Sequence, residues 1–532
     1  MDRVFINGKI YTTDGSFSVA EAVAVRNGIF LAVGTNDEVK TAANSKAEVV
    51  DLGGRVAVPG IVESHLHLSL LGTFLLQINA VGKTKEAVLA EIAAEARTAK
   101  PGEWVCGRGW NELSWDGAMP AKAELDAVAP DVPVCMIRVC GHAVWVNSKA
   151  LEMAGIDRNS PDPVGGEIER DASGEPNGIL VDTAAQLVRA LPPPLSDQKK
   201  RQAYALAEKH LLSFGITNVH DMAAMSGYDY GTIEFLKKMY EEGVLKIGVA
   251  SYISAYSAED AYRAGPEAGL FGGRFTARGI KFFSDGSLGA RSAWMLGDYD
   301  DRPGHRGNGR YSDGELYEIV RAAQVHGFQP ALHAIGDAAN RQALDVYERV
   351  LKELPEPADH RFRIEHAQIL DAADIPRFSQ LGVIPSMQYI HCTSDKDMIG
   401  LRIGERRLTG AFAWRTLLDR GSIIPGGSDA PVEPVNPFWG MHGAVTRQDH
   451  NGNPPGGWRP EERATRVEAL KSFTIWGAYA AFEEGIKGSV EPGKLADLAV
   501  LDRDIMACEP EAIKNATCTA TILSGEVVYG NL

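Results

Sequence analysis

The chain has 532 residues, of which 54 are basic and 70 acidic, so its formal net charge is −16. A hydrophobic content of 45% and a charged content of 23% are ordinary for globular proteins, which excludes disorder as the dominant state. The acidic balance argues against a nucleic acid or a membrane surface as a partner, because either would call for a basic face. No apolar run approaches the ~18 residues of a membrane span.

The six cysteines are few and scattered, without the C-x-x-C spacing of a metal or redox motif. Free thiols in a reducing compartment fit this pattern better than a disulfide framework does. The first residues carry no basic segment followed by an apolar stretch of the signal-peptide type. We therefore expect a soluble, cytoplasmic protein.

Both ends of the chain have the pattern of short strands joined by tight turns. Near the N-terminus, Asn7-Gly8 and Asn27-Gly28 are hairpin turn signals between apolar runs. Residues 498–502 and 520–529 have a similar pattern. Because an isolated hairpin is only marginally stable in water, we predict one composite β-sandwich built from residues 1–57 and 485–532.

Residues 58–484 show a different pattern, in which short apolar runs alternate with amphipathic helical stretches. The eight strand candidates span residues 60–67, 216–221, 245–252, 279–285, 329–334, 362–367, 383–388 and 422–429. Strand–helix alternation repeated eight times predicts an α/β fold, the (β/α)8 TIM barrel. The interval between the first two candidates far exceeds the ~30 residues of one barrel unit, so we expect an inserted lobe at about residues 75–200.

Side chains that can bind a metal recur at the ends of these strand candidates. Two imidazoles at alternate positions of the first strand point to one face. Active sites of such barrels lie at the C-terminal strand ends, so the residues ending strands one, four, five, six and eight are expected to converge. They are His65, His67, Lys281, His333, His366 and Asp429. This set of nitrogen and oxygen donors suits Zn²⁺ or a similar divalent ion, and it suffices for two ions if an oxygen donor bridges them.

Each of these residues alone has an ordinary explanation. His366 could be a hydrogen-bonded core histidine, Asp429 could serve as a turn residue or a helix N-cap, and Lys281 could pair with Asp285. Their joint placement at corresponding strand ends favours the metal site.

Five further residues are weaker candidates for contacting the substrate or for supporting the metal ligands. They are His142, His220, Asp285, Asp337 and Trp110. Partners that orient metal-bound imidazoles are expected in any such site, but structural hydrogen bonding or core packing is an equal alternative for each of the five.

At these residues the sequence resembles the amidohydrolase superfamily, and within it the amidohydrolase 3 group, which includes N-substituted formamide deformylases. The resemblance covers essentially the whole chain and includes segments 141–151, 215–222, 281–286, 333–337, 427–433 and 492–498. It implies that the four strand-end histidines are metal ligands and that Asp429 is the catalytic carboxylate. In many members the strand-four lysine is carboxylated and bridges two metals, and Lys281 matches that position. A one-metal site with an unmodified lysine is the alternative.

The predicted function is a metal-dependent hydrolase that cleaves a C–N bond, an amide or N-substituted formamide, in a small organic substrate. A divalent ion lowers the pKa of bound water from about 16 to about 7, and Asp429 would act as general base and then as general acid. One alternative is hydrolysis of cyclic amides, carbamates or esters at the same site. Another is a non-catalytic metal-binding or regulatory barrel. We expect one or two divalent ions per chain, with Zn²⁺ first, and the resemblance implies a homodimer.

Overall fold

The structure is a computed structural model that describes residues 2–532 except 116, 140–141, 164, 224–229, 355 and 357–358. The chain forms two compact units, one of Met1–Leu71 with Ala207–Leu532 and one of Gly72–Leu206. Five of the six cysteines are free thiols, and Cys140 lies outside the described residues, as does Gly141 of the segment 141–151. Among the described residues, none of the helices has the length and apolar character needed to cross a membrane.

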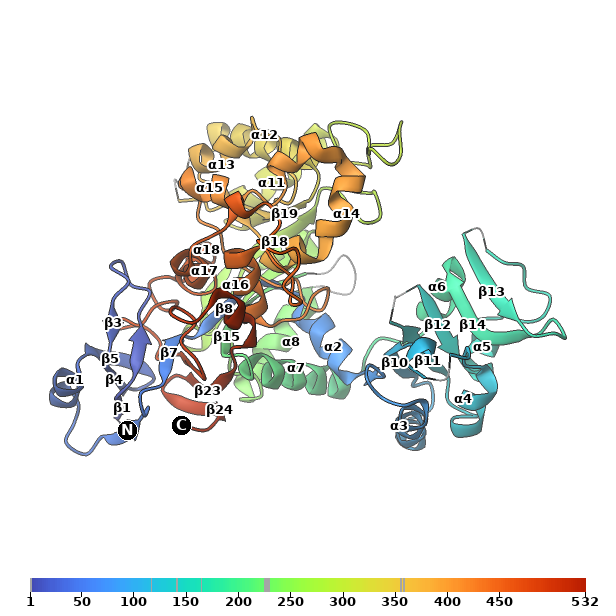
Figure 1. Cartoon of the computed structure of the whole chain (residues 1–532), viewed down its shortest axis with the longest axis horizontal. Coiled ribbons are helices and arrows are strands. Elements are labelled where there is room, and N and C mark those ends of the chain that lie inside the picture. The colour runs from blue at the N-terminus through green and yellow to red at the C-terminus, as the bar shows by residue number, and fades with distance from the viewer. Residues whose placement is uncertain are drawn as a thin grey trace. The chain divides into compact units, whose positions relative to one another are not determined.

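Seven parallel strands of the first unit form a nearly closed barrel in the order β21-β20-β19-β18-β16-β15-β8, labelled in part in Figure 1. They are β8 (Ile61–Leu66), β15 (Ile216–Met222), β16 (Gly248–Ser254), β18 (Phe275–Phe283), β19 (Gln329–Ala334), β20 (Arg363–His366) and β21 (Ile384–Ser386). A short strand, β17 (Glu267–Gly269), pairs with β18 in the antiparallel direction. The predicted barrel fold is thereby confirmed, since strands alternate with helices along the chain.

The segment predicted as the eighth strand, residues 422–429, is not a continuous strand in the structure. Isolated parallel bridges join Gly426 to Met387 and Ala430 to Leu66. The backbone N–H of Asp429 donates to the carbonyl of His65 at 2.7 Å. The segment therefore fills the gap between β21 and β8. It forms no regular ladder because Asp429 has a φ of +62°, which is outside the extended region.

Helices follow most barrel strands along the chain. They are α8 (Tyr230–Glu241), α9 (Ala258–Ala264), α10 (Leu270–Gly273), α11 (Asp313–Val325), α12 (Asp337–Glu353), α13 (Ile375–Leu381), α14 (Tyr389–Arg407), α15 (Trp414–Asp419), α16 (Pro437–Thr446), α17 (Arg466–Ser472) and α18 (Ile475–Ala480). Helix α11 begins with a capping box between Ser312 and Glu315. In α12 the buried Ala339, Ala343 and Val346 recur at helical spacing, which explains why the helix keeps one face against the protein.

Strands from both ends of the chain form two further sheets in the first unit. One has the order β5-β4-β1-β6 and the other the order β24-β23-β22-β7-β2-β3. Their strands are β1 (Arg3–Ile6), β2 (Lys9–Tyr11), β3 (Val19–Ala20), β4 (Ala22–Arg26), β5 (Ile29–Gly34), β6 (Glu48–Asp51), β7 (Val56–Pro59), β22 (Leu498–Leu501), β23 (Cys518–Leu523) and β24 (Glu526–Gly530), with helix α1 (Asn36–Ala42) beside them in sequence. Because β7 pairs with both β2 and β22, the two chain ends share one sheet, and Phe5, Phe30 and Val500 lie in one apolar core.

The second unit has its own sheet, in the order β13-β14-β12-β11-β10-β9. Its strands are β9 (Ile78–Asn79), β10 (Val105–Trp110), β11 (Val134–Arg138), β12 (Ala143–Val146), β13 (Gly166–Arg170) and β14 (Pro176–Asp182), and its helices include α3 (Lys85–Thr98), α4 (Lys122–Val128), α5 (Ser148–Met153) and α6 (Thr183–Arg189). Two helices, α2 (Leu68–Leu76) and α7 (Asp197–Leu212), span its boundaries with the first unit. An apolar core containing Trp110, Met136 and Trp145 belongs to this unit alone.

Candidate metal centre

Two imidazoles at the end of β8 face the carboxylate of Asp429. The Nε2 atoms of His65 and His67 lie 3.5 and 3.1 Å from Oδ1 of Asp429. On the opposite side of each ring, Nδ1 of His65 lies 2.6 Å from Oε2 of Glu365, and Nδ1 of His67 lies 2.6 Å from the carbonyl oxygen of Met222. Both acceptors hold the ring proton on Nδ1 and leave the Nε2 lone pair facing Asp429.

Two more imidazoles come from neighbouring strands. His366 ends β20, and its ring centroid lies 4.9 Å from that of His65 and 4.5 Å from that of His333 in β19. Nδ1 of His366 lies 2.6 Å from Oε1 of Gln388, which again leaves Nε2 free. His333 is reversed, because its Nε2 lies 3.2 Å from the carbonyl oxygen of Gly286, and Nδ1 is its free nitrogen.

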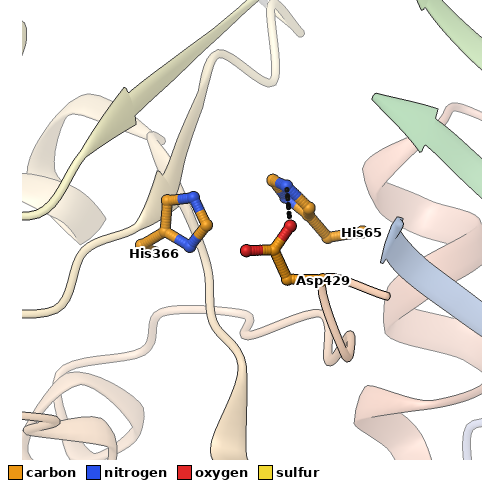
Figure 2. A group of neighbouring side chains, drawn as sticks. All are labelled: His65, His366 and Asp429. Atoms are coloured by element: carbon orange, nitrogen blue, oxygen red, sulfur yellow. Dashed lines mark ion pairs between the residues drawn. The ribbon is translucent and has the colours of Figure 1, made fainter. Parts of the chain in front are cut away.

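Asp429 and Lys281 complete the group. Figure 2 shows His65, His366 and Asp429 turned toward one another, and one ligand atom from each lies within 4.8 Å of the others. The Nζ atom of Lys281, which is buried in β18, lies 3.4 Å from Nε2 of His65. The structure therefore brings all six predicted strand-end residues into one cluster.

The surroundings set the charge of this cluster. Burial raises the pKa of Asp429, but the nearby imidazoles of His67, His65 and His366 hold it well below its usual range. Burial lowers the pKa of His65 to about 4, with the charge of Lys281 acting in the same direction. Burial also lowers the pKa of Lys281 to about 8, against the raising effect of nearby carboxylates. Near neutral pH the cluster thus offers the carboxylate of Asp429 and the unprotonated imidazoles of His65, His333 and His366, the forms that ligate metals.

These observations fit a divalent cation. In His65, His67 and His366 the Nδ1 atom is bound to the protein on the outer side of the ring, and Oδ1 of Asp429 is buried yet makes no hydrogen bond within the part of the chain that the structure describes. His366 and Asp429 also have left-handed backbone, with φ of +73° and +62°. Such strain in non-glycine residues is characteristic of functional sites, where it aims a side chain that regular strand geometry would direct elsewhere.

Comparison with known proteins agrees with this geometry. A family model described as "Amidohydrolase family" matches residues 48–529. The chain belongs to the amidohydrolase family. This amidohydrolase is 34% identical to Protein LONG AFTER FAR-RED 3 of Arabidopsis thaliana, over 99% of this chain and 91% of that protein. It is 31% identical to the N-substituted formamide deformylase of Arthrobacter pascens, over 99% and 98% of the two chains.

A solved structure supports the same assignment. The crystal structure of an uncharacterized metal-dependent hydrolase from Pyrococcus furiosus has a TM-score of 0.78 and 28% sequence identity to this amidohydrolase. The match covers 95% of this chain and 100% of that chain. Together the family and the neighbour support a metal-dependent hydrolase.

Two of the weaker candidates, Asp285 and Asp337, hydrogen-bond to backbone N–H groups of loops near the cluster. Asp285 accepts backbone N–H bonds from Trp294, Ile335 and Gly336 at 2.8–3.1 Å, and burial raises its pKa to about 7. Asp337 begins α12 and accepts from the backbone N–H of Leu296 at 2.8 Å. These two carboxylates hydrogen-bond to the loops that follow β18 and β19, and His333 lies near the end of β19.

His220 lies in β15 with a fully buried ring. Its Nδ1 accepts a hydrogen bond from Arg363 at 2.8 Å, because a guanidinium can only donate. Its Nε2 makes no hydrogen bond to any described residue. Burial and the charge of Arg363 hold the pKa of His220 well below its usual range, so the ring is neutral.

The two remaining candidates lie in the second unit. Trp110 is fully buried in that unit's core, where its indole N–H donates to the carbonyl of Met136 at 2.7 Å. His142 is 75% exposed, and its Nδ1 lies 2.8 Å from Oδ1 of Asp182. Packing accounts for the position of Trp110, whereas the His142 ring is open to solvent.

The structure adds residues that the sequence analysis did not select. Glu365 and Gln388 bind the Nδ1 atoms of His65 and His366. Glu63 lies in β8 and accepts the backbone N–H of Ser428 at 2.8 Å, which ties the closing segment to the barrel. The signal for Glu63 was a carboxylate that follows the apolar Ile61 and Val62 in a strand, because unpaired carboxylates are almost never fully buried. Glu365 carried no such signal, because Arg363 and His366 in the same strand are polar as well.

His391 is a further addition. It lies in the first turn of α14, and its ring stacks on that of His366 at a centroid distance of 5.9 Å and an angle of 16°. Its Nε2 lies 3.8 Å from Oδ2 of Asp429 and makes no hydrogen bond within the described part of the chain. The two oxygens of Asp429 thus face different partners, the β8 imidazoles on one side and His391 on the other.

Proposed function

We propose that this amidohydrolase cleaves a C–N bond in a small organic molecule, and that the substrate is an N-substituted formamide or a related amide. The observation that carries the proposal is the convergence of three imidazoles, each with its outer nitrogen bound to the protein, on the ionised Asp429. The substrate class is supported by the full-length similarity to an N-substituted formamide deformylase.

In this proposal the six clustered residues hold one or two divalent ions, with Zn²⁺ as the first candidate because imidazole and carboxylate ligands suit it. Bound there, a divalent ion would lower the pKa of water to about 7 and polarise a substrate carbonyl. The lowered pKa of Lys281 increases its neutral amine fraction, the form that attacks CO₂. We therefore include a carboxylated Lys281 in the proposal, in which the amine loses a proton as its nitrogen bonds to carbon.

Asp429 is the proposed general base and acid. Its carboxylate is ionised at neutral pH and can accept a proton from the attacking water. The same oxygen can then deliver this proton to the departing nitrogen, so that the amine leaves as a neutral molecule. His391 faces the other oxygen of Asp429.

The test combines composition with turnover. Metal per chain is measured by elemental analysis, and the intact mass under native conditions reports an added CO₂ on Lys281. Formate release is then followed from N-butylformamide and formanilide, with a cyclic amide, a carbamate and an ester as competing probes. Asp429→Asn is the control.

Formate release by the wild type but not by Asp429→Asn supports the proposal. Turnover of the cyclic amide, carbamate or ester alone would replace the substrate class while keeping the site. Equal turnover by both forms would overturn the catalytic assignment of Asp429. Absence of metal in the folded protein, together with no turnover, would favour a regulatory barrel.

A further inference from the structure

A fully buried guanidinium joins most of the barrel strands beside the proposed metal centre. Arg363 lies in β20, two residues before Glu365, and its side chain has no solvent exposure. Its N–H groups reach acceptors on five strands, which are the carbonyl of Ser64 (2.9 Å), Nδ1 of His220 (2.8 Å), the hydroxyl of Tyr252 (2.8 Å), the carboxylate of Glu365 (2.7 and 3.0 Å) and the hydroxyl of Ser386 (2.9 Å). Its position is therefore fixed by the barrel itself.

This network ends on a proposed metal ligand. Glu365 accepts from Arg363 through both carboxylate oxygens, and its Oε2 also lies 2.6 Å from Nδ1 of His65. Because the guanidinium fork fixes the plane of the carboxylate, it also fixes the direction of the bond to His65. The chain Arg363–Glu365–His65 thus sets both the ring orientation and the nitrogen that carries the proton.

The other three imidazoles are supported differently, and the Nε2 atom of His333 faces the backbone carbonyl of Gly286. The outer nitrogen of His67 faces the backbone carbonyl of Met222, and that of His366 faces the neutral amide of Gln388. A charged acceptor forms a hydrogen bond roughly twice as strong as a neutral one and makes the imidazole a better electron donor. Among His65, His67 and His366, His65 is the one whose partner is a carboxylate.

We propose that the Arg363–Glu365 pair is the positioning element of His65, and that metal affinity depends more on this pair than on the neutral partner of His366. The inference rests on the proposed metal centre, but it requires no particular substrate. It is tested by metal binding in the absence of turnover.

The decisive variant is Glu365→Gln, which keeps the shape of the side chain and removes its charge. Zinc affinity of the metal-free full-length protein is measured by competition with a chromophoric chelator. We expect Glu365→Gln to bind zinc about 10–100-fold more weakly than the wild type. Gln388→Met removes the acceptor behind His366 and should cost less, and Tyr252→Phe removes one neutral partner of Arg363 and should leave the affinity within about twofold.

Because Glu365→Gln leaves Arg363 buried without its counter-charge, it can unfold the barrel. Glu365→Asp is therefore the second variant, since it keeps the charge but shortens the reach to His65. Circular dichroism verifies the fold of each variant. A folded Glu365→Asp with weakened zinc binding supports the inference, and wild-type affinity in either folded Glu365 variant overturns it. If zinc affinity changes among the variants as expected but the wild type hydrolyses no amide, the proposed function is overturned and this inference stands.

Discussion

The candidate functional residues of the barrel differ from those of the second unit in their burial and hydrogen bonding. In the barrel, His65 and His366 are buried and the Nδ1 atom of each ring is bound by a partner from another element, while the nearby Oδ1 of Asp429 makes no hydrogen bond to any described residue. In the second unit, Trp110 uses its single donor within the core, and His142 projects into solvent. Burying a polar atom without a hydrogen-bond partner destabilises the folded state unless the atom binds a ligand. The barrel residues therefore indicate function more strongly than those of the second unit.

The largest expected effect is at Asp429. Asp429→Asn keeps the side-chain size but removes the proton acceptor, so we expect kcat on the formamide probes to fall about 10²–10⁴-fold. Steady-state kinetics with elemental analysis measures this effect. A turnover loss accompanied by full loss of metal would instead mean that Asp429 acts only as a ligand.

The next largest effect is expected on stability, at the buried ion pair of Arg274 and Asp497 in the first unit. Arg274 donates to both oxygens of Asp497 at 2.6 and 2.7 Å, and both side chains are buried. Asp497→Asn leaves Arg274 without its counter-charge, so we expect the free energy of unfolding to fall by about 3–5 kcal/mol. Denaturant titration measures the loss, while metal content and the KM of the purified variant should stay unchanged.

The same pair makes stability depend on acid. Burial raises the pKa of Asp497, but the charge and hydrogen bonds of Arg274 hold it below its ordinary value. The stabilisation is therefore complete above the unfolded pKa of about 3.9 and is lost as the pH falls through the lower folded pKa. As the pH falls below about 5, the free energy of unfolding should decrease more in the wild type than in Asp497→Asn, because only the wild type has this carboxylate to protonate. If the free energy of unfolding falls equally with pH in the two proteins, this assignment is contradicted.

Trp110→Phe tests the second unit. The change leaves the carbonyl of Met136 without its indole donor and a gap in the core, so we expect a loss of about 1–3 kcal/mol in unfolding free energy. Thermal and chemical denaturation measure it. An unchanged stability together with a tenfold rise in KM would assign Trp110 to the substrate pocket rather than to packing.

The smallest expected effect is that of His142→Ala. The ring is exposed, so the free energy of unfolding should change by no more than about 0.5 kcal/mol. Asp182→Asn is the matched control, because it alters the partner of His142 without removing the ring. If both variants lower kcat/KM on the formamide probes by a similar factor, His142 belongs with the functional residues despite its exposure.

The sequence predicted that the six strand-end residues lie close together, because topology alone brings the ends of parallel strands together. Residues such as His333 and His366 needed only their strand position for this prediction. The closing segment was predicted as a strand, but the positive φ of Asp429 arises from its fit between β8 and β21 and has no local signal in the sequence. The bond between Glu365 and His65 joins positions 300 residues apart, and no periodicity encodes which carboxylate meets which ring.

The sheet shared by the two chain ends has a consequence for synthesis. Strand β7 ends at Pro59, and its partner β22 begins at Leu498, more than 400 residues later. At ribosomal rates of about 5–20 residues per second, β7 waits roughly 20–90 s before that partner exists. During this interval its free edge offers unpaired N–H and C=O groups to any other nascent strand. Residues made more than 400 positions later thus cover an edge that is made early, so termination before Leu498 would release chains prone to aggregate through β7.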